Sequence, residues 1–103
     1  MIVRLVTATV KAERAGTFNE LMRAQLPALR SSPGLVYVKL ARRMRGDFEE
    51  VLLYEEWHDT ASLYDWTGRE LDQARLEPGA AELVTSLSIV HYEALDIDPD
   101  PDG

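Results

Sequence analysis

The stretch VLLYEEWHDT, residues 51–60, marks the point where a strand runs directly into the start of a helix. Its first half is rich in Val, Leu and Tyr, which favour strands. Asp59 or Thr60 provides the N-cap of a helix that continues through Leu63 and Trp66. Both tryptophans of the chain, Trp57 and Trp66, lie at this junction. Because tryptophan is large and flat and carries one N–H donor, the pair either fills a core or lines a pocket for a flat ligand.

The residues upstream of this junction predict two strands and a helix. Residues 2–10 are rich in β-branched side chains and predict the first strand, and residues 35–42 predict the second. Thr17 and Glu20 have the spacing of a capping box, and Pro27 is expected to kink or break the helix near its end. The apolar stripe of this helix is formed by Phe18, Leu21, Met22, Leu26 and Leu29.

The remaining elements complete a β-α-β-β-α-β order. A turn at residues 45–47 joins the second strand to a third at residues 49–57, so these two form an antiparallel hairpin. Gly68 is expected to divide the second helix, residues 80–83 predict a short helical turn, and residues 84–95 predict the fourth strand. This order predicts an α+β, ferredoxin-like fold with a four-stranded antiparallel sheet. Residues 1–95 form one domain, and the Asp- and Pro-rich residues 96–103 form an acidic tail that is expected to be flexible.

Apolar side chains occur on both faces of the predicted strands. Val51, Leu53 and Trp57 point one way, whereas Leu52 and Tyr54 point the other. Helices can cover only one face, and monomers rarely expose a large apolar patch. A second copy packing sheet on sheet would bury the other face, which predicts a homodimer. The alternative is a half-solvated sheet with scattered apolar residues.

Composition excludes several function classes. The net charge is −7, and the four aspartates of residues 96–103 leave −3 for the rest, so nucleic-acid binding is not expected. The chain has no Cys, which excludes disulfides and thiolate chemistry. No signal peptide and no apolar run long enough to span a membrane is recognisable, so the expected location is the cytoplasm, with no membrane contact.

Taken together, these elements resemble the antibiotic biosynthesis monooxygenase (ABM) family, within the dimeric α/β-barrel superfamily. The likeness covers roughly residues 1–95 and is specific for the fold but weak for the reaction. Members of the superfamily include cofactor-free oxygenases of polycyclic phenols, heme-degrading enzymes, isomerases, decarboxylases and proteins with no known activity. The matching residues are Val10 and Lys11 at the end of the first strand, Phe18, Pro33 and Gly34, Trp57 and Asp59, and His91 to Glu93.

The heme-degrading members of the superfamily can be compared position by position. In them a helix Trp lies ten residues before a His that binds iron, and an Asn on the first strand assists. The segment that ends in Trp66 resembles that helix, but the tenth residue after it is Leu76, and the first strand has Thr7 and Thr9 in place of Asn. Two of the three key positions therefore differ from those of the heme-degrading members, which argues against heme binding in the same way.

The resemblance implies a site between the sheet and the helices. Its catalytic candidates are His91, a general base or proton shuttle, and Trp66, a pocket wall; the alternatives are a locally bonded or interface histidine and a core anchor. Substrate binding is predicted at Thr7, Tyr37, Tyr64 and Trp66. His91 and His58 have no metal-ligand spacing, so no metal and no cofactor is expected.

Two functions follow from the sequence as hypotheses. The first is a cofactor-independent monooxygenase that acts on a small, electron-rich aromatic of the phenol or quinol type, in which the deprotonated substrate supplies electrons to O₂. The second is a non-enzymatic dimer of the same fold that binds a small ligand or serves a structural role. Pocket chemistry distinguishes them, because a collapsed cavity without titratable groups favours the second. A heme protein whose ligand is His91 or His58 is a weaker third reading.

Overall fold

Four antiparallel strands form one sheet in the order β2-β3-β1-β4. The computed structural model describes residues 1–68, 76 and 79–95. The strands are β1 (Ile2–Lys11), β2 (Leu35–Arg45), β3 (Phe48–Trp57) and β4 (Val84–Glu93). This α+β, ferredoxin-like arrangement is the predicted one, because β2 and β3 form the hairpin and β1 lies between β3 and β4. The tail predicted for residues 96–103 lies outside the described residues.

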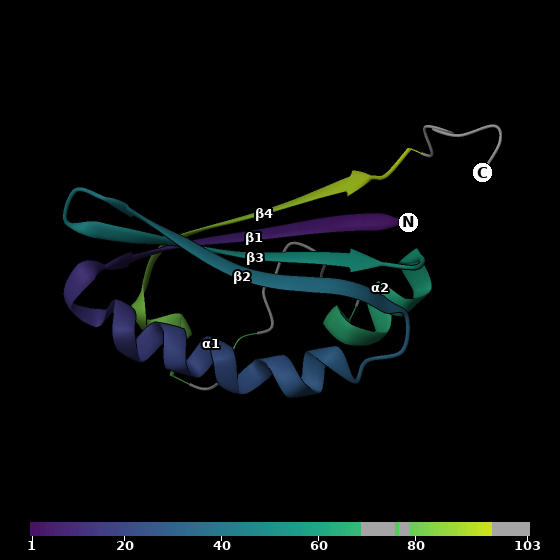
Figure 1. Ribbon diagram of the computed structural model, residues 1–103, viewed down its shortest axis with the longest axis horizontal. Helices are drawn as coiled ribbons and strands as arrows, with labels where there is room; N and C mark the ends of the chain where they lie inside the picture. Colours follow the sequence, from purple (N-terminus) through teal and green to yellow (C-terminus); the bar gives the residue numbers. More distant parts are fainter. Residues whose placement is uncertain (69–75, 77–78, 96–103) are drawn as a thin grey trace, which may run out of the picture.

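Two helices cover one face of the sheet and leave the other open (Figure 1). They are α1 (Ala15–Arg30) and α2 (Thr60–Thr67), and two short 3₁₀ turns, η1 (Ala12–Arg14) and η2 (Ala81–Leu83), precede α1 and β4. The turn η2 falls where the sequence predicted a helical turn. Neither helix is long and apolar enough to cross a membrane within the part of the chain that the structure describes.

The start of α1 differs from the sequence prediction. The helix begins at Ala15, with Arg14 in the N-cap position and no side-chain cap, so the capping box predicted at Thr17 and Glu20 is wrong. The physical reason is that η1, which directly precedes Ala15, already winds the chain into a helical path before Thr17 is reached. Pro27 does not break the helix, which continues to Arg30. Leu29, beyond the proline, is fully buried and holds this last turn against the core.

The start of α2 agrees with the prediction. Asp59 is the N-cap, and its carboxylate accepts a 2.8 Å hydrogen bond from the Ser62 amide. Gly68 is the C-cap of α2, since its φ of +74° lies in the region that glycine favours and its N–H bonds to the Tyr64 carbonyl. The expected continuation of the helix after Gly68 lies outside the described residues. The junction of residues 51–60 therefore places the start of α2 directly after the end of β3.

The core lies between the sheet and the helices. Alternate residues of β1 and β3 are buried on this face, and Phe18, Met22 and Leu29 of α1 meet them, as the apolar stripe predicted. The two faces predicted for β3 are also those observed: Val51 and Leu53 are buried, whereas Leu52 and Tyr54 are only partly covered. We call these the helix face and the open face of the sheet.

Candidate functional site

Charged side chains interrupt the helix face at one end of the sheet. Arg4 of β1 lies directly opposite Glu55 of β3 on one side and His91 of β4 on the other. Arg4 and Glu55 are each only 1% exposed, and His91 is half-buried. Directly opposed residues of antiparallel strands share a face, so the three side chains form one row across three strands. We call Arg4, Glu55 and His91 the polar row.

Hydrogen bonds connect the polar row to Trp57. The Arg4 Nη1 atom lies 3.1 Å from Nε2 of His91, and its Nε lies 4.0 Å from Oε1 of Glu55. The same Glu55 oxygen accepts a 2.7 Å hydrogen bond from the indole N–H of Trp57, which is fully buried. Since a guanidinium can only donate, Nε2 of His91 is the acceptor, and the proton of the neutral ring is on Nδ1.

Burial changes the acid–base properties of all three members. Desolvation raises the pKa of Glu55 above its ordinary value, against the opposing effects of the Trp57 hydrogen bond and the Arg4 charge. The pKa of His91 is lowered by desolvation and, second, by the Arg4 charge, and desolvation lowers the pKa of Arg4. The arrangement therefore holds a neutral imidazole beside a buried cation, a combination that can accept a proton and stabilise an anion.

Trp66 lies on the same side of the sheet as the polar row. It is 8% exposed, belongs to the hydrophobic core and faces the sheet from α2 together with Leu63. Its outer edge borders a hollow of about 300 Å³ between the end of α1 and α2. Tyr64 of the same helix is 41% exposed. The structure thus places two of the predicted site residues, Trp66 and His91, on the helix face.

Thr7 and Tyr37 lie on the open face instead. Thr7 is opposite Leu52, and Tyr37 stacks edge-on against Tyr54 with ring centroids 5.8 Å apart. Within one subunit the sheet separates these side chains from Trp66 and His91. Substrate binding by Thr7, Tyr37 and Tyr64 therefore stays a prediction. Contact with Thr7 or Tyr37 requires a ligand that lies on the open face.

Sequence reasoning missed Arg4 and Glu55. The available signal was the strand alternation itself: Arg4 has the parity of Val6 and Ala8, and Glu55 has that of Val51 and Leu53. A charged residue at an inward position of an otherwise apolar strand indicates a buried pair or a site. By contrast, Arg43 and Arg45, near the turn between β2 and β3, both form ion pairs with Glu50, so these charged side chains do not indicate a site.

Other groups of the described chain show no metal-binding geometry. No set of three or more His, Asp or Glu side chains gathers among the residues that the structure describes. His58 is exposed beside Asp59, whose pKa is lowered to about 2 by the backbone and side-chain hydrogen bonds of Ser62 and by His58. Leu76, at the position compared with the heme-binding His, packs partly buried against the core.

The model of the antibiotic biosynthesis monooxygenase family matches residues 1–78, and the chain belongs to this family. No curated protein matches the chain.

Several solved structures share the fold at low sequence identity. A protein of Nitrosomonas europaea classed with the antibiotic biosynthesis monooxygenases is 19% identical, with a TM-score of 0.74 over 92% of this chain and 99% of that one. Another, from Deinococcus radiodurans, is 20% identical, with a TM-score of 0.70 over 91% and 92% of the two chains. A serine variant of MhuD with two manganese protoporphyrin IX molecules per active site is 16% identical, with a TM-score of 0.67 over 92% and 95%.

Proposed function

We propose that this protein is a cofactor-independent monooxygenase that oxidises a small phenol- or quinol-type aromatic with O₂. The observation that carries the proposal is the contact between Arg4 and His91, which holds a neutral imidazole acceptor against a buried guanidinium. Membership of the antibiotic biosynthesis monooxygenase family supports the reaction class. The substrate type is the hypothesis that the sequence resemblance raised.

In the proposed reaction the phenolic proton moves to Nε2 of His91. As it does so, the Arg4 N–H turns from that nitrogen to the phenolate oxygen, so the cation remains paired throughout. The phenolate gives electrons to O₂, and a bond forms between a ring carbon and one oxygen atom. The peroxide O–O bond then breaks as the proton on that carbon leaves. A hydroxyarene and O₂ thus give a quinone and one water molecule.

The remaining predicted residues have supporting roles in this proposal. Trp66 forms a wall of the pocket on the helix side, and its position at the edge of the hollow of about 300 Å³ supports this assignment. Tyr64, on the exposed side of α2, and Thr7 and Tyr37, on the open face, are proposed substrate contacts that depend on ligand entry or on a partner subunit.

The open face supports a homodimer as part of the proposal. Its exposed side chains include Tyr37, Val90 and Tyr92, which are 45%, 39% and 55% exposed in the single chain. Two copies that pack these faces together would form the dimeric barrel predicted from the sequence. A cytoplasmic location remains an expectation of the sequence.

A non-enzymatic, ligand-binding domain is the second candidate. One observation favours it: Trp57 and Trp66 are both buried in the core, and the Trp57 N–H already bonds to Glu55. Both tryptophans can therefore serve as core anchors without contacting a ligand.

Oxygen consumption distinguishes the two candidates. The protein would be supplied with a panel of polyphenols and hydroquinones under air, without added cofactor. We expect turnover that falls about 100-fold or more in His91→Gln and in Arg4→Met, because a positioned base contributes 10²–10⁴-fold. His58→Gln is the matched control, since it removes an exposed imidazole. Equal loss in all three variants, or equal rates in all three, would refute the assignment of the polar row, and binding without turnover would favour the second candidate.

A further inference from the structure

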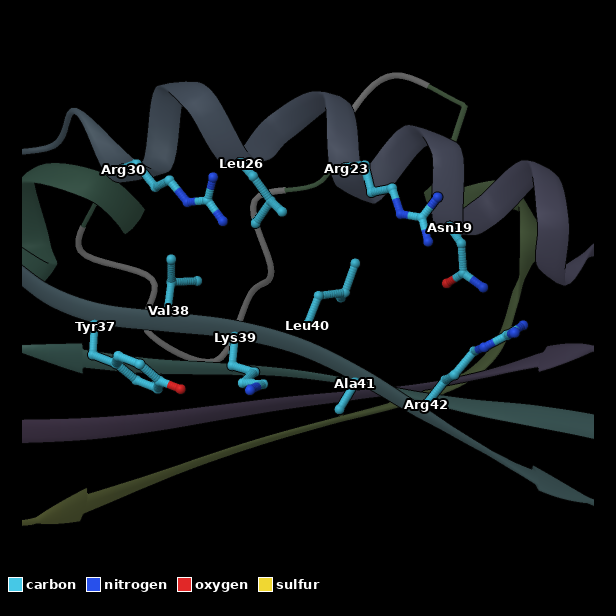
Figure 2. A pocket seen from close by; sticks show the side chains of 10 residues that line it. All are labelled: Asn19, Arg23, Leu26, Arg30, Tyr37, Val38, Lys39, Leu40, Ala41 and Arg42. Atoms are coloured by element: carbon cyan, nitrogen blue, oxygen red, sulfur yellow. The ribbon is translucent and has the colours of Figure 1, made fainter.

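A separate groove runs between α1 and the edge strand β2 (Figure 2). Its volume is about 460 Å³, within the range of about 300–1,000 Å³ that is usual for small-molecule sites. In Figure 2, Arg23, Leu26 and Arg30 point from α1 toward β2, and Val38 and Leu40 point from β2 toward α1. The groove therefore has an apolar floor at its centre and guanidinium groups at its rim.

A buried carboxylate organises one end of this groove. Glu49 of β3 is 1% exposed and accepts a 2.6 Å hydrogen bond from the Asn19 amide nitrogen at Oε2. Its other oxygen, Oε1, accepts a 2.9 Å bond from Nη1 of Arg42. Both carboxylate oxygens are thus occupied, so the charge of Glu49 is compensated inside the protein and does not repel an anion in the groove.

The Asn19 side chain leaves one atom without a partner. Asn19 is nine-tenths buried, and its amide orientation is fixed because the nitrogen must face the Glu49 carboxylate. Its oxygen, Oδ1, then points into the groove and has no hydrogen-bond donor among the residues that the structure describes. A buried acceptor without a donor is costly, and a ligand that donates a hydrogen bond to this oxygen would remove that cost.

The rim adds an excess of positive charge. Arg23 and Arg30 have no acidic partner within the described part of the chain, whereas Arg42 is paired with Glu49. Two guanidinium groups without an acidic partner among the described residues therefore face one groove in a protein whose net charge is −7. Guanidinium groups bind carboxylates through paired, charge-assisted hydrogen bonds.

We propose that the groove between α1 and β2 binds a small organic acid that carries a carboxylate, an apolar body and a hydroxyl or amine donor. Arg23 and Arg30 bind the carboxylate, Leu26, Val38 and Leu40 contact the body, and Oδ1 of Asn19 accepts from the donor. The polar row lies on β1, β3 and β4, whereas this groove lies at the β2 edge. The site is therefore additional to the proposed oxygenase site and does not depend on it.

A titration followed by amide NMR tests this proposal, with para-hydroxyphenylacetate as the probe. We expect saturable shifts at the Asn19 side-chain amide and at Val38 and Leu40, with a dissociation constant of about 1 mM or tighter. The double variant Arg23→Gln/Arg30→Gln should weaken binding about tenfold or more. The double variant Arg14→Gln/Arg45→Gln removes the same charge outside the groove and should bind as the wild type does.

Two analogues test the individual contacts. The neutral para-hydroxyphenylacetamide should bind at least tenfold more weakly, because it lacks the charge that the guanidinium groups recognise. Phenylacetate should bind several-fold more weakly, because it cannot donate to Asn19. Shifts that do not saturate, that centre on His91, or that weaken equally in both double variants would overturn the proposal. All four arginines are exposed, and the amide spectrum of each variant reports its fold directly.

Discussion

Arg4 places a guanidinium group on the helix face of β1, where the next residues on the same face, Val6 and Ala8, belong to the apolar core. Its charge lies between a carboxylate that burial makes harder to ionise and an imidazole that burial makes harder to protonate. Proton transfer within this row therefore leaves its net charge unchanged, whereas a proton that enters from outside adds one positive charge. This property distinguishes the polar row from Arg43 and Glu50, an exposed pair that contributes little to stability.

The first prediction concerns the titration of His91. Its pKa lies below the ordinary value of 6.5, so the folded state binds fewer protons than the unfolded state over the window just below 6.5. The stability linked to His91 is thus fully present above pH 6.5 and is lost as the pH falls through this window. In Arg4→Met the midpoint should rise toward 6.5, because the cation that opposes protonation is gone. Side-chain ¹³C NMR of the ring measures it, and an unchanged midpoint would mean that burial alone sets the pKa.

The residue scale is also where the sequence predicted least. His91 and Trp66 were found from the family resemblance, and the structure places both on the helix face. Arg4 and Glu55 were missed because a sequence pattern shows which face a side chain occupies, not which charged side chains meet there. Pairing of Arg4 with both neighbours depends on the registers β1–β3 and β1–β4, which join residues far apart in the chain.

At the scale of elements, local chemistry predicted α2 well and the start of α1 poorly. Asp59 caps α2 through a contact within three residues, which a sequence motif can specify. The start of α1 depends on η1, whose residue Ala12 donates a 2.9 Å hydrogen bond to the Asp47 carbonyl in the β2–β3 turn. No local motif contains that contact, so the capping-box spacing of Thr17 and Glu20 was misleading.

The second prediction concerns the turn between α1 and β2. Gly34 has a φ of +87°, and a Cβ there would collide with the Ser62 side chain of α2. Its carbonyl also accepts a 2.7 Å hydrogen bond from the His58 amide, so the turn cannot move freely. Gly34→Ala should lower the free energy of unfolding by about 1–3 kcal/mol.

Gly16→Ala is the matched control for that substitution. It makes the same chemical change at a helical position with open space around the new methyl group, so stability should stay equal or rise slightly. Urea denaturation of both variants measures the difference. Equal stability of the two variants would show that the turn and the Ser62 side chain can move apart to accommodate the methyl group without a loss of stability.

At the scale of the whole molecule, the sheet has one covered face and one open face (Figure 1). The apolar residues on both faces of β3 predicted an apolar face that the helices do not cover. The open face combines aromatic and aliphatic side chains that are one-third to one-half exposed, such as Val90 and Tyr92. Burial of such side chains against a second copy is favourable by roughly 25 cal/mol per Å² of apolar area.

The final prediction is that the protein is a dimer held together by this open face. Val90→Asp should produce monomers, because each subunit would bury a carboxylate without a partner in an apolar interface. Leu87→Asp is the matched control: it lies on the same strand with nearly the same exposure, 42% against 39%, but opposite Ala8 on the helix-face side. Sedimentation equilibrium should give about twice 11.6 kDa for the wild type and Leu87→Asp, and the single mass for Val90→Asp. A wild-type monomer, or equal masses for the two variants, would assign the open face to solvent and leave Thr7 and Tyr37 without a partner subunit to complete their predicted site.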